Sequence, residues 1–327
     1  MRDLSDLIRT FSKFRNRNRI DRLCRFHDIS NLSADMRTRR TSLIQFYSSN
    51  NNIGNYLPVL GIWRMLGAQV DTWCMHNVDI DFDYINKHYK GVIIGGAGLL
   101  HQSFEPFWEL LAKKCKLPMV VWGVGGCFVD SDRKSLVNRK IGSSVMRRCD
   151  YVNLRDDITA EYYEISNASI SPCPTIEYLD EFRSRINVDR KPLYASHEEL
   201  VPTKDERDIR KTVRKIARSV AFTDNIQRTD FGLYDILLYR YCNTDLVITT
   251  RLHGAIIAYG LSIPYIIIPY DEKLRAFHRL YGNGVVAGTW NDMERAFEDI
   301  GNITIKDIQI DLVRNFGEKV KNWATSF

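Results

Sequence analysis

Two successive series of short apolar segments, each alternating with helical patterns, constrain the fold of this 327-residue chain more than any other feature. The segments are rich in β-branched residues and apolar throughout, as in strands that are buried on both faces of a sheet. The first series predicts strands at 42–47, 69–73, 91–95, 119–123, 151–154 and 168–171. The second predicts them at 193–196, 219–223, 245–249 and 265–269. We therefore expect an α/β fold with two Rossmann-like domains, each with a parallel sheet, facing one another across a cleft.

Helical patterns separate these strands and complete the domain plan. They lie near 56–67, 104–116, 132–149 and 157–165, and then near 204–218, 230–241, 251–261, 271–281 and 291–300. A final helix is expected over 307–323, with Asp307 as its N-cap. The polar segment 181–192 is typical of a linker. The plan is thus a basic arm over 1–40, domains over 41–182 and 190–290, and C-terminal helices over 291–327.

Composition narrows the class of protein. Hydrophobic residues make up 44% and charged residues 26% of the chain, the balance of a soluble globular protein. No apolar run reaches the 18 or so residues of a spanning helix, and the N-terminus has no signal-peptide core, so we expect a cytoplasmic protein. The seven cysteines are scattered singly, without disulfide-like or zinc-like spacing. We predict no metal and no cofactor.

The net charge of +6 is concentrated in the first 40 residues, which hold eleven Lys or Arg and five Asp. The remaining 287 residues carry 35 basic and 35 acidic side chains and are neutral overall. Packing on the body explains such an arm most simply, and peripheral contact with an anionic membrane surface comes second. Nucleic acid is not expected as a partner, because no aromatic stacking platforms are interleaved with the arginines.

Three glycine-containing loops follow expected strands of the first domain. In the first, Asn52 and Asn55 flank a turn at Gly54 and offer amide donors and acceptors. The second contains Gly96 and Gly98, and the third contains Gly125. Neither of these two runs completes a dinucleotide fingerprint, because His101 and Phe128 stand where the last glycine is required. They remain suited to placing backbone amides around an anion, and His101 adds an imidazole for proton transfer.

Two arginines mark further strand ends. Arg155 follows the strand at 151–154, where its planar fork suits a carboxylate or phosphate, although an ion pair with Asp156 or Asp157 explains it equally well. Arg251 and His253 flank the start of an apolar helix that Thr249 or Thr250 could cap. A guanidinium, an imidazole and free backbone N–H groups at one helix start predict an anion site.

With these residues in place, the chain resembles the polysaccharide pyruvyltransferase family. The likeness runs through NNIGN (51–55), IIGGAGLLHQ (93–102), WGVGG (122–126), NLRDDIT (153–159) and ITTRLHGAIIAYGLSIPYIIIPYDEK (248–273) and covers about residues 42–285. The last block is the most specific, because Arg-Leu-His-Gly and the later Tyr-Asp-x-Lys ending at Lys273 occur together. Family members commonly have Gly-Asp where this chain has Gly54-Asn55.

The resemblance implies a GT-B-like fold and an enzyme that moves the enolpyruvyl or pyruvyl group of phosphoenolpyruvate onto a sugar hydroxyl of a surface polysaccharide or exopolysaccharide precursor. It implies Arg155, Arg251 and His253 as ligands of the donor, with His101 as acid or base. The partners would be phosphoenolpyruvate and a saccharide acceptor, free or lipid-linked. His197 and Glu198 are second choices as base. The alternatives are a nucleotide-sugar glycosyltransferase of the GT-B type and a non-catalytic, glycan-binding relative.

Overall fold

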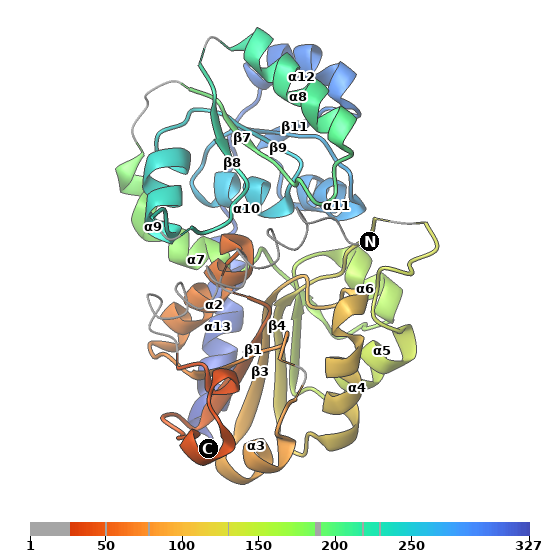
Figure 1. Ribbon diagram of the computed structural model, residues 1–327, viewed down its shortest axis with the longest axis vertical. Helices are drawn as coiled ribbons and strands as arrows, with labels where there is room; N and C mark the ends of the chain where they lie inside the picture. Colours follow the sequence, from red (N-terminus) through yellow and green to blue (C-terminus); the bar gives the residue numbers. More distant parts are fainter. Residues whose placement is uncertain are drawn as a thin grey trace, which may run out of the picture.

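A computed structural model describes residues 27–49, 51–77, 79–129, 131–186, 191–217, 219–228 and 230–327. Two α/β domains are stacked along the long axis of the molecule, and each is built around one parallel sheet (Figure 1). The expected fold class is confirmed. Of the predicted arm, residues 1–26 lie outside the described part. Residues 27–40 pack on the N-terminal domain, where the His27 carbonyl accepts from the Thr72 N–H of β2 at 3.0 Å and Arg37 pairs with Asp81, the N-cap of α3, at 2.7 Å.

The N-terminal domain holds the first sheet, whose strands run in the order β2-β1-β3-β4-β5-β6. They are β1 (Leu43–Tyr47), β2 (Asp71–Cys74), β3 (Gly91–Ala97), β4 (Met119–Val124), β5 (Tyr151–Leu154) and β6 (Ser169–Ile170). Its helices are α2 (Ile53–Leu66), α3 (Phe82–His88), α4 (Glu105–Lys114), α5 (Arg139–Arg147), α6 (Asp157–Tyr163) and α7 (Thr175–Leu179). Successive side chains of β1 enter opposite cores, with Tyr47 on the α2 side and Phe46 on the side of α3 and α4.

The C-terminal domain holds the second sheet, in the order β11-β10-β9-β7-β8. Its strands are β7 (Leu193–Ala195), β8 (Ala221–Thr223), β9 (Val247–Thr249), β10 (Tyr265–Ile267) and β11 (Gly284–Val286). The helices that follow are α8 (Thr203–Ile216), α9 (Leu233–Ile236), α10 (Leu252–Gly260), α11 (Glu272–Tyr281), α12 (Met293–Ile300) and α13 (Ile310–Thr325). A π-helical turn, Leu237–Tyr241, continues α9, so the expected helix at 230–241 is shorter and irregular.

Both sheets have the same connectivity, and this positions the site. In each, the first strand lies between the second and the third, so the chain reverses direction across the sheet between β1 and β3 and again between β7 and β9. Ligands of open α/β sheets bind beyond the carboxyl ends of the strands at such reversal points. The two reversal points open toward the boundary between the domains.

The last two helices serve different domains. Helix α12 packs against β10, β11 and α8 in the C-terminal domain, whereas α13 returns to the N-terminal domain and packs against α2 and α7 (Figure 1). Helix α7 also contacts α10, and a single apolar cluster runs from α2 and α13 through α7 to α10. The two domains therefore share a core.

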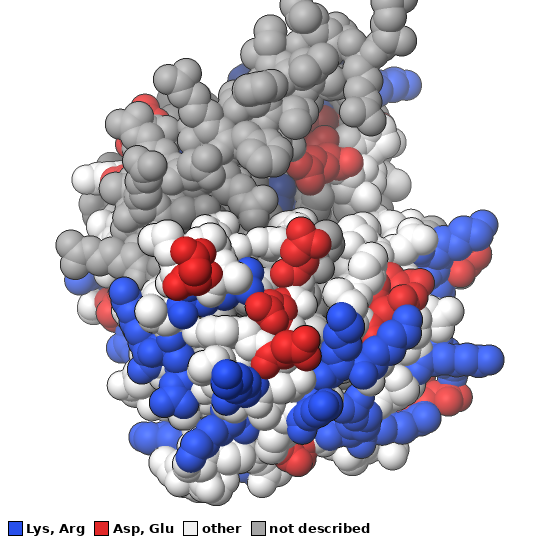
Figure 2. All heavy atoms as spheres, turned by 60° about the horizontal axis from the view of Figure 1, so that its bottom comes forward, with Lys and Arg blue, Asp and Glu red and all other residues white. Residues whose placement is uncertain are grey.

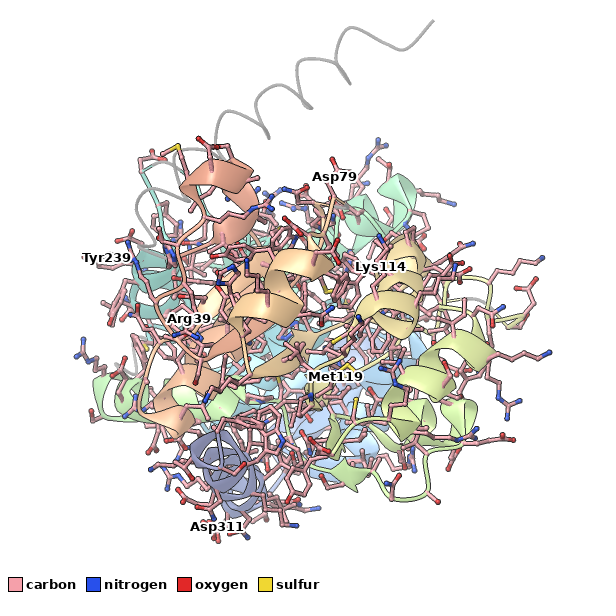
Figure 3. The ribbon with its side chains drawn as sticks, turned by 90° about the horizontal axis from the view of Figure 1, so that it is seen from below. Arg39, Asp79, Lys114, Met119, Tyr239 and Asp311 are labelled. Carbon is pink, nitrogen blue, oxygen red and sulfur yellow. The ribbon has the colours of Figure 1, made fainter. Side chains whose placement is uncertain are left out.

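Basic side chains gather at the pole of the N-terminal domain that lies opposite the second domain (Figure 2). Viewed from below, this pole contains Arg39, Lys114 and the start of β4 at Met119 (Figure 3). Lys87, Lys114 and Arg147 occupy the last turns of α3, α4 and α5. All crossover helices of a parallel sheet end at the same pole, and cations there offset the negative ends of the helix dipoles. The fold thus accounts for this basic pole without a partner.

The expected cap of the last helix was wrong, and two short elements were missed. Helix α13 begins at Ile310 with Gln309 at its N-cap, so Asp307 does not cap it. Helix α3 and strand β11 were not expected. Both are short, and the Gly284–Val286 strand is only half-buried at the edge of its sheet, so neither carries a strong hydrophobic pattern.

Docking of α13 on the N-terminal domain can be tested by comparing a substitution on its buried face with one on its exposed face. The Phe316 ring is 4% exposed and packs edge-on against Trp122 of β4, with centroids 5.5 Å apart. We expect Phe316→Ala to lower the free energy of unfolding by about 3–5 kcal/mol through the cavity that it leaves. The control Leu312→Ala, on the exposed face of the same helix, should cost less than about 1 kcal/mol in the same denaturant titration. Equal losses would show that α13 is not docked.

Candidate active site

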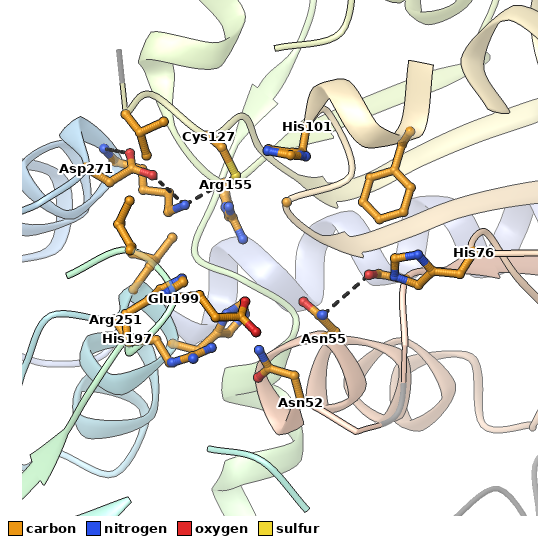
Figure 4. Close-up of a pocket in the computed structure, with 18 residues that line it drawn as sticks. Asn52, Asn55, His76, His101, Cys127, Arg155, His197, Glu199, Arg251 and Asp271 are labelled. Atoms are coloured by element: carbon orange, nitrogen blue, oxygen red, sulfur yellow. Dashed lines mark hydrogen bonds and ion pairs between the residues drawn. The ribbon is translucent and has the colours of Figure 1, made fainter. Parts of the chain in front are cut away.

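A cavity of about 370 Å³ lies at the boundary of the two domains, beyond the carboxyl ends of both sheets. Its wall comes from the loops after β1, β2, β3, β4 and β5 in the N-terminal domain and from those after β7, β9 and β10 in the C-terminal domain. The loop after β2 contributes His76, which the sequence analysis did not single out. Side chains from both domains point into it (Figure 4). The cavity therefore exists only because the domains meet.

The loop after β1 contributes the first turn of helix α2. Asn52 is its N-cap and accepts a 2.9 Å hydrogen bond from the Gly54 N–H, while Asn55 donates to the Ser48 hydroxyl at 3.4 Å. Gly54 lies inside the helix and does not form the expected turn. A Cβ there would fall 2.6 Å from the His253 ring, so glycine is required for the imidazole of the other domain to approach.

The loop after β3 places its glycines differently. Gly98 lines the cavity, whereas Gly96 does not, because a Cβ at Gly96 would meet Pro58 of α2 at 2.2 Å. His101 lines the cavity and is the N-cap of a short 3₁₀ turn, with its Nδ1 accepting from the Ser103 N–H at 3.2 Å. That bond assigns the proton of the neutral ring to Nε2.

The loop after β4 connects the domains. The Phe128 N–H donates to the Asp271 carboxylate at 3.1 Å, and the Phe128 carbonyl accepts from the Glu272 N–H at 3.1 Å. Gly125 lies over the Arg155 guanidinium, where a Cβ would come within 2.4 Å of Nε. Gly125 thus acts by leaving space for the arginine.

Arg155 both faces the cavity and lies beside a carboxylate, the two arrangements that the sequence analysis left open. Its side chain is 4% exposed, lines the cavity and lies 3.7 Å from the Asp156 carboxylate, which is 2% exposed. Asp157 pairs instead with Arg279 at 2.8 Å. Among the described residues, Nε and Nη1 of Arg155 have no hydrogen-bond partner. Burial raises the pKa of Asp156, which weakens its compensation of the guanidinium. A buried cation in this state favours an anion beside it.

Helix α10 begins at the cavity from the other side. Arg251 is its N-cap residue, and no side chain caps the helix, so neither Thr249 nor Thr250 has the expected role. The Thr249 hydroxyl accepts from the Arg251 N–H at 2.9 Å, and the Thr250 hydroxyl accepts from the His197 N–H at 2.8 Å. The Arg251 Nε donates to the Ser196 carbonyl at 3.1 Å. These bonds hold the guanidinium beside the positive end of the helix.

Lys273 supplies a third buried cation. Its ammonium lies 2.6 Å from the Asp271 carboxylate and donates to the Cys127 sulfur at 3.3 Å. Burial works against the charged form, but the Cys127 sulfur and Asp271 more than offset it, so the pKa of Lys273 is raised. Lys273 remains protonated at neutral pH.

His253 lies among these three cations. Burial, followed by the charges of Arg155, Arg251 and Lys273, holds its pKa well below the ordinary value of 6.5. The imidazole is therefore neutral at pH 7. The helix start thus carries one guanidinium and one neutral ring that can donate or accept a hydrogen bond.

The segment after β7 was only partly anticipated. His197 lines the cavity, but Glu198 is ion-paired with Arg210 at 3.0 Å and points elsewhere, while Glu199 reaches the cavity. Phe104 and Cys127 also line it and were not expected, because nothing in their local sequence distinguishes them.

The structure thus brings together most of the predicted residues. Those at the cavity are Asn52, Asn55, Gly98, His101, Arg155, Arg251, His253 and Lys273. Gly96 and Gly125 instead support the packing of Pro58 and Arg155. Within the described ranges, no cluster of three His, Cys, Asp or Glu side chains could hold a metal ion. No helix in the same part of the chain is long and apolar enough to cross a membrane.

The buried histidines predict a pH dependence of stability. Burial, then Arg251 and Lys273, lower the pKa of His197 from 6.5 to about 4. Between these values the unfolded chain binds a proton that the folded chain rejects, so the free energy of unfolding falls as the pH drops. Replacing the ring in His197→Gln should remove up to about 3 kcal/mol of this loss between pH 7 and pH 4. Denaturant titrations across that range would contradict the assignment if wild type and variant gave parallel profiles.

Similar solved structures share the fold. UDP-GlcNAc 2-epimerase from Methanocaldococcus jannaschii, in complex with UDP-GlcNAc and UDP, superposes with a TM-score of 0.55 at 11% identity, over 88% of this chain and 99% of its own. The UDP co-structure of MnaA from S. aureus gives 0.58 at 10% identity, over 87% and 97%. A putative UDP-N-acetylglucosamine 2-epimerase from Listeria monocytogenes gives 0.53 at 12% identity, over 81% and 89%. At these identities the likeness shows the two-domain GT-B-type fold alone.

Sequence comparison decides the family. No curated protein matches the chain. The family model described as polysaccharide pyruvyl transferase matches residues 52–272, more than half of the sequence, and spans every loop of the cavity from Asn52 to Asp271. The chain therefore belongs to the polysaccharide pyruvyl transferase family and is a transferase.

Proposed function

We propose that this transferase uses phosphoenolpyruvate as donor and forms a pyruvate ketal on a sugar of a surface polysaccharide precursor. One observation carries the proposal, namely that Arg155, Arg251 and Lys273 are all buried and all act on His253 within a single cavity. Three cations at one site favour an anionic ligand, although Asp271 offsets part of their charge through its ion pair with Lys273. Phosphoenolpyruvate carries a carboxylate and a phosphate on a three-carbon frame and is such a ligand.

Each domain binds one of the two anionic groups of the donor. Arg251 and the uncapped start of α10 hold one group, and Arg155 holds the other from the opposite wall. Fixing both ends orients the C2 carbon toward the acceptor, and such positioning supplies a large part of the rate enhancement. Lys273, which remains protonated, adds positive charge beside the departing phosphate.

The reaction then needs one proton delivered and two removed. A proton added to the methylene carbon makes C2 electrophilic, and a sugar hydroxyl attacks C2 as it loses its own proton. Phosphate leaves, and a second hydroxyl attacks the same carbon to close the ketal. His101, with its Nε2 proton, is the proposed donor to the methylene. His253, neutral among cations, is suited to accept a hydroxyl proton or to donate a hydrogen bond to the donor.

The proposed acceptor is a saccharide precursor, free or lipid-linked, and the proposed setting is the cytoplasm, with peripheral contact at a membrane surface. The acceptor follows from the family, whose members act on polysaccharides. No observation on the described residues favours a nucleotide sugar over phosphoenolpyruvate. UDP-GlcNAc is therefore the competitor in the tests below.

Donor binding tests the proposed function directly. In titration calorimetry, phosphoenolpyruvate should bind wild type, whereas UDP-GlcNAc should not compete. Arg251→Ala should weaken binding by about 10- to 100-fold, the worth of a charge-assisted hydrogen bond, and abolish phosphate release with a saccharide acceptor. The matched control is Arg295→Ala, whose side chain is 86% exposed on α12 and which should bind as wild type does. Binding of UDP-GlcNAc in place of phosphoenolpyruvate would overturn the proposal.

His101 should act on the rate and leave donor affinity unchanged. Because its ring lines the cavity and does not belong to the cationic group, His101→Ala should keep the Kd for phosphoenolpyruvate within about twofold and lower kcat by roughly 100-fold. His88→Ala, at the far pole, is the control. A variant that loses donor affinity but keeps its kcat would assign His101 to binding.

A further inference from the structure

Cys127 differs from the other cysteines of this protein in its surroundings. Of the six described cysteines, Cys74, Cys115, Cys149, Cys173 and Cys242 are buried, and only Cys127 is partly exposed. It is also the one among these six that lines the cavity between the domains. Neither the family match nor the mechanism above uses it.

The thiol lies in a strongly electropositive position. The Lys273 ammonium donates to its sulfur at 3.3 Å, and the sulfur in turn contributes to the raised pKa of Lys273. A lysine ammonium next to the sulfur is one of the surroundings in which reactive cysteines are found. Exposed and electropositive surroundings are those of reactive cysteines, whereas buried thiols in apolar surroundings are inert.

A second, independent observation points to an anionic ligand beside the sulfur. The position that a Cβ of Gly98 would occupy lies 3.2 Å from the Cys127 sulfur and 3.6 Å from Nη2 of Arg155. Arg155 is 4% exposed, and its Nε and Nη1 have no hydrogen-bond partner among the described residues. In Figure 4 its guanidinium points into the cavity next to Cys127. A small anion that reaches Arg155 is thereby brought to the thiol.

We propose that Cys127 is a site of covalent modification by small carboxylates that carry an electrophilic carbon. Arg155 binds the carboxylate of the reagent. The electrophilic carbon of the reagent then lies beside the Cys127 sulfur, which accepts a hydrogen bond from Lys273. The inference rests on the anion preference of the cavity, which the proposed function shares, but it does not require phosphoenolpyruvate to be the donor. Modification adds bulk and a fixed carboxylate beside Arg155 and so closes the anion site.

Iodoacetate shows the step in balanced form. The sulfur of the thiolate forms a bond to the methylene carbon, the carbon–iodine bond breaks, and iodide leaves with the bonding electrons. The proton formerly on sulfur has already passed to solvent. The product is S-carboxymethylcysteine, whose new carboxylate lies toward Arg155. No oxidant or further reactant is needed.

Selectivity follows from charge and burial. A positively charged cleft raises the local concentration of a small anion by about 10-fold or more. A neutral reagent of the same shape gains nothing from Arg155 and Lys273. Burial raises the pKa of the thiols of Cys115, Cys149, Cys173 and Cys242, which keeps them protonated and less reactive. Among the six described cysteines, an anionic reagent should therefore choose Cys127.

The experiment compares iodoacetate with its neutral analogue iodoacetamide on the full-length protein, each rate being divided by the rate with N-acetylcysteine. Peptide mapping by mass spectrometry assigns the modified residue. We expect Cys127 to be carboxymethylated first, with a normalised preference for iodoacetate of about tenfold or more. Inorganic phosphate should slow this reaction, because it occupies the same cations. A normalised preference near one, or first modification at Cys24 or any buried cysteine, would overturn the proposal.

Variants separate charge from exposure. Cys127→Ala should lose the fast-modified site. Lys273→Gln should lower the preference for iodoacetate at Cys127, whereas Lys211→Gln, whose side chain is 70% exposed on α8, should leave it unchanged. If Lys273→Gln does not fold, phosphate competition on wild type gives the same test. Failure of phosphoenolpyruvate to bind would refute the proposed function alone, whereas modification independent of phosphate would refute this inference alone.

Discussion

The arrangement at the domain boundary depends on one electrostatic constraint, which is that three buried cations surround a neutral imidazole. Arg155 comes from the N-terminal domain, whereas Arg251 and Lys273 come from the C-terminal domain, and together with burial they depress the pKa of His253. Three carboxylates accompany them. Asp156 has a raised pKa, Asp271 is shared between Lys273 and the Phe128 N–H, and Glu199 lines the cavity and acts on Arg251. Arg155 Nε and Nη1 still lack a hydrogen-bond partner among the described residues, and an anionic ligand would supply one.

The like charges stay close together because contacts around the cavity hold the two domains against one another. The His253 ring packs on Gly54, the Phe128 backbone bonds to both Asp271 and Glu272, and a common apolar cluster runs through α7. Without them the like charges would separate into water, where each is solvated at no cost. The packing between the domains thus keeps the three cations close together in the cavity.

Much of this could be read from the sequence, because periodicity and strand-end chemistry are local properties. The ten predicted strands are all present, and Arg155, Arg251 and His253 lie at one cavity as the parallel-sheet rule requires. What failed depends on contacts between distant segments. Gly54 is glycine because of His253, 199 residues later, and Gly96 because of Pro58. The neutral state of His253 likewise follows from burial and from charges on other loops, which no local pattern contains.

Some departures from local rules lie at or beside the cavity, although other buried polar atoms without a hydrogen-bond partner, such as Trp122 Nε1 and Asn225 Nδ2, lie elsewhere in the described structure. Among the described residues, buried side-chain atoms without a hydrogen-bond partner include Arg155 Nε and Nη1, Asp156 Oδ2 and His197 Nδ1. Helix α10 starts without a side-chain cap, although Thr249 and Thr250 stand next to its first turn and hydrogen-bond elsewhere. Each of these features lowers stability on its own, and a fold selected for stability alone would remove them. An anion bound between Arg155 and the start of α10 would satisfy the guanidinium and the helix N–H groups together, so the same features that destabilise the empty cavity provide its affinity.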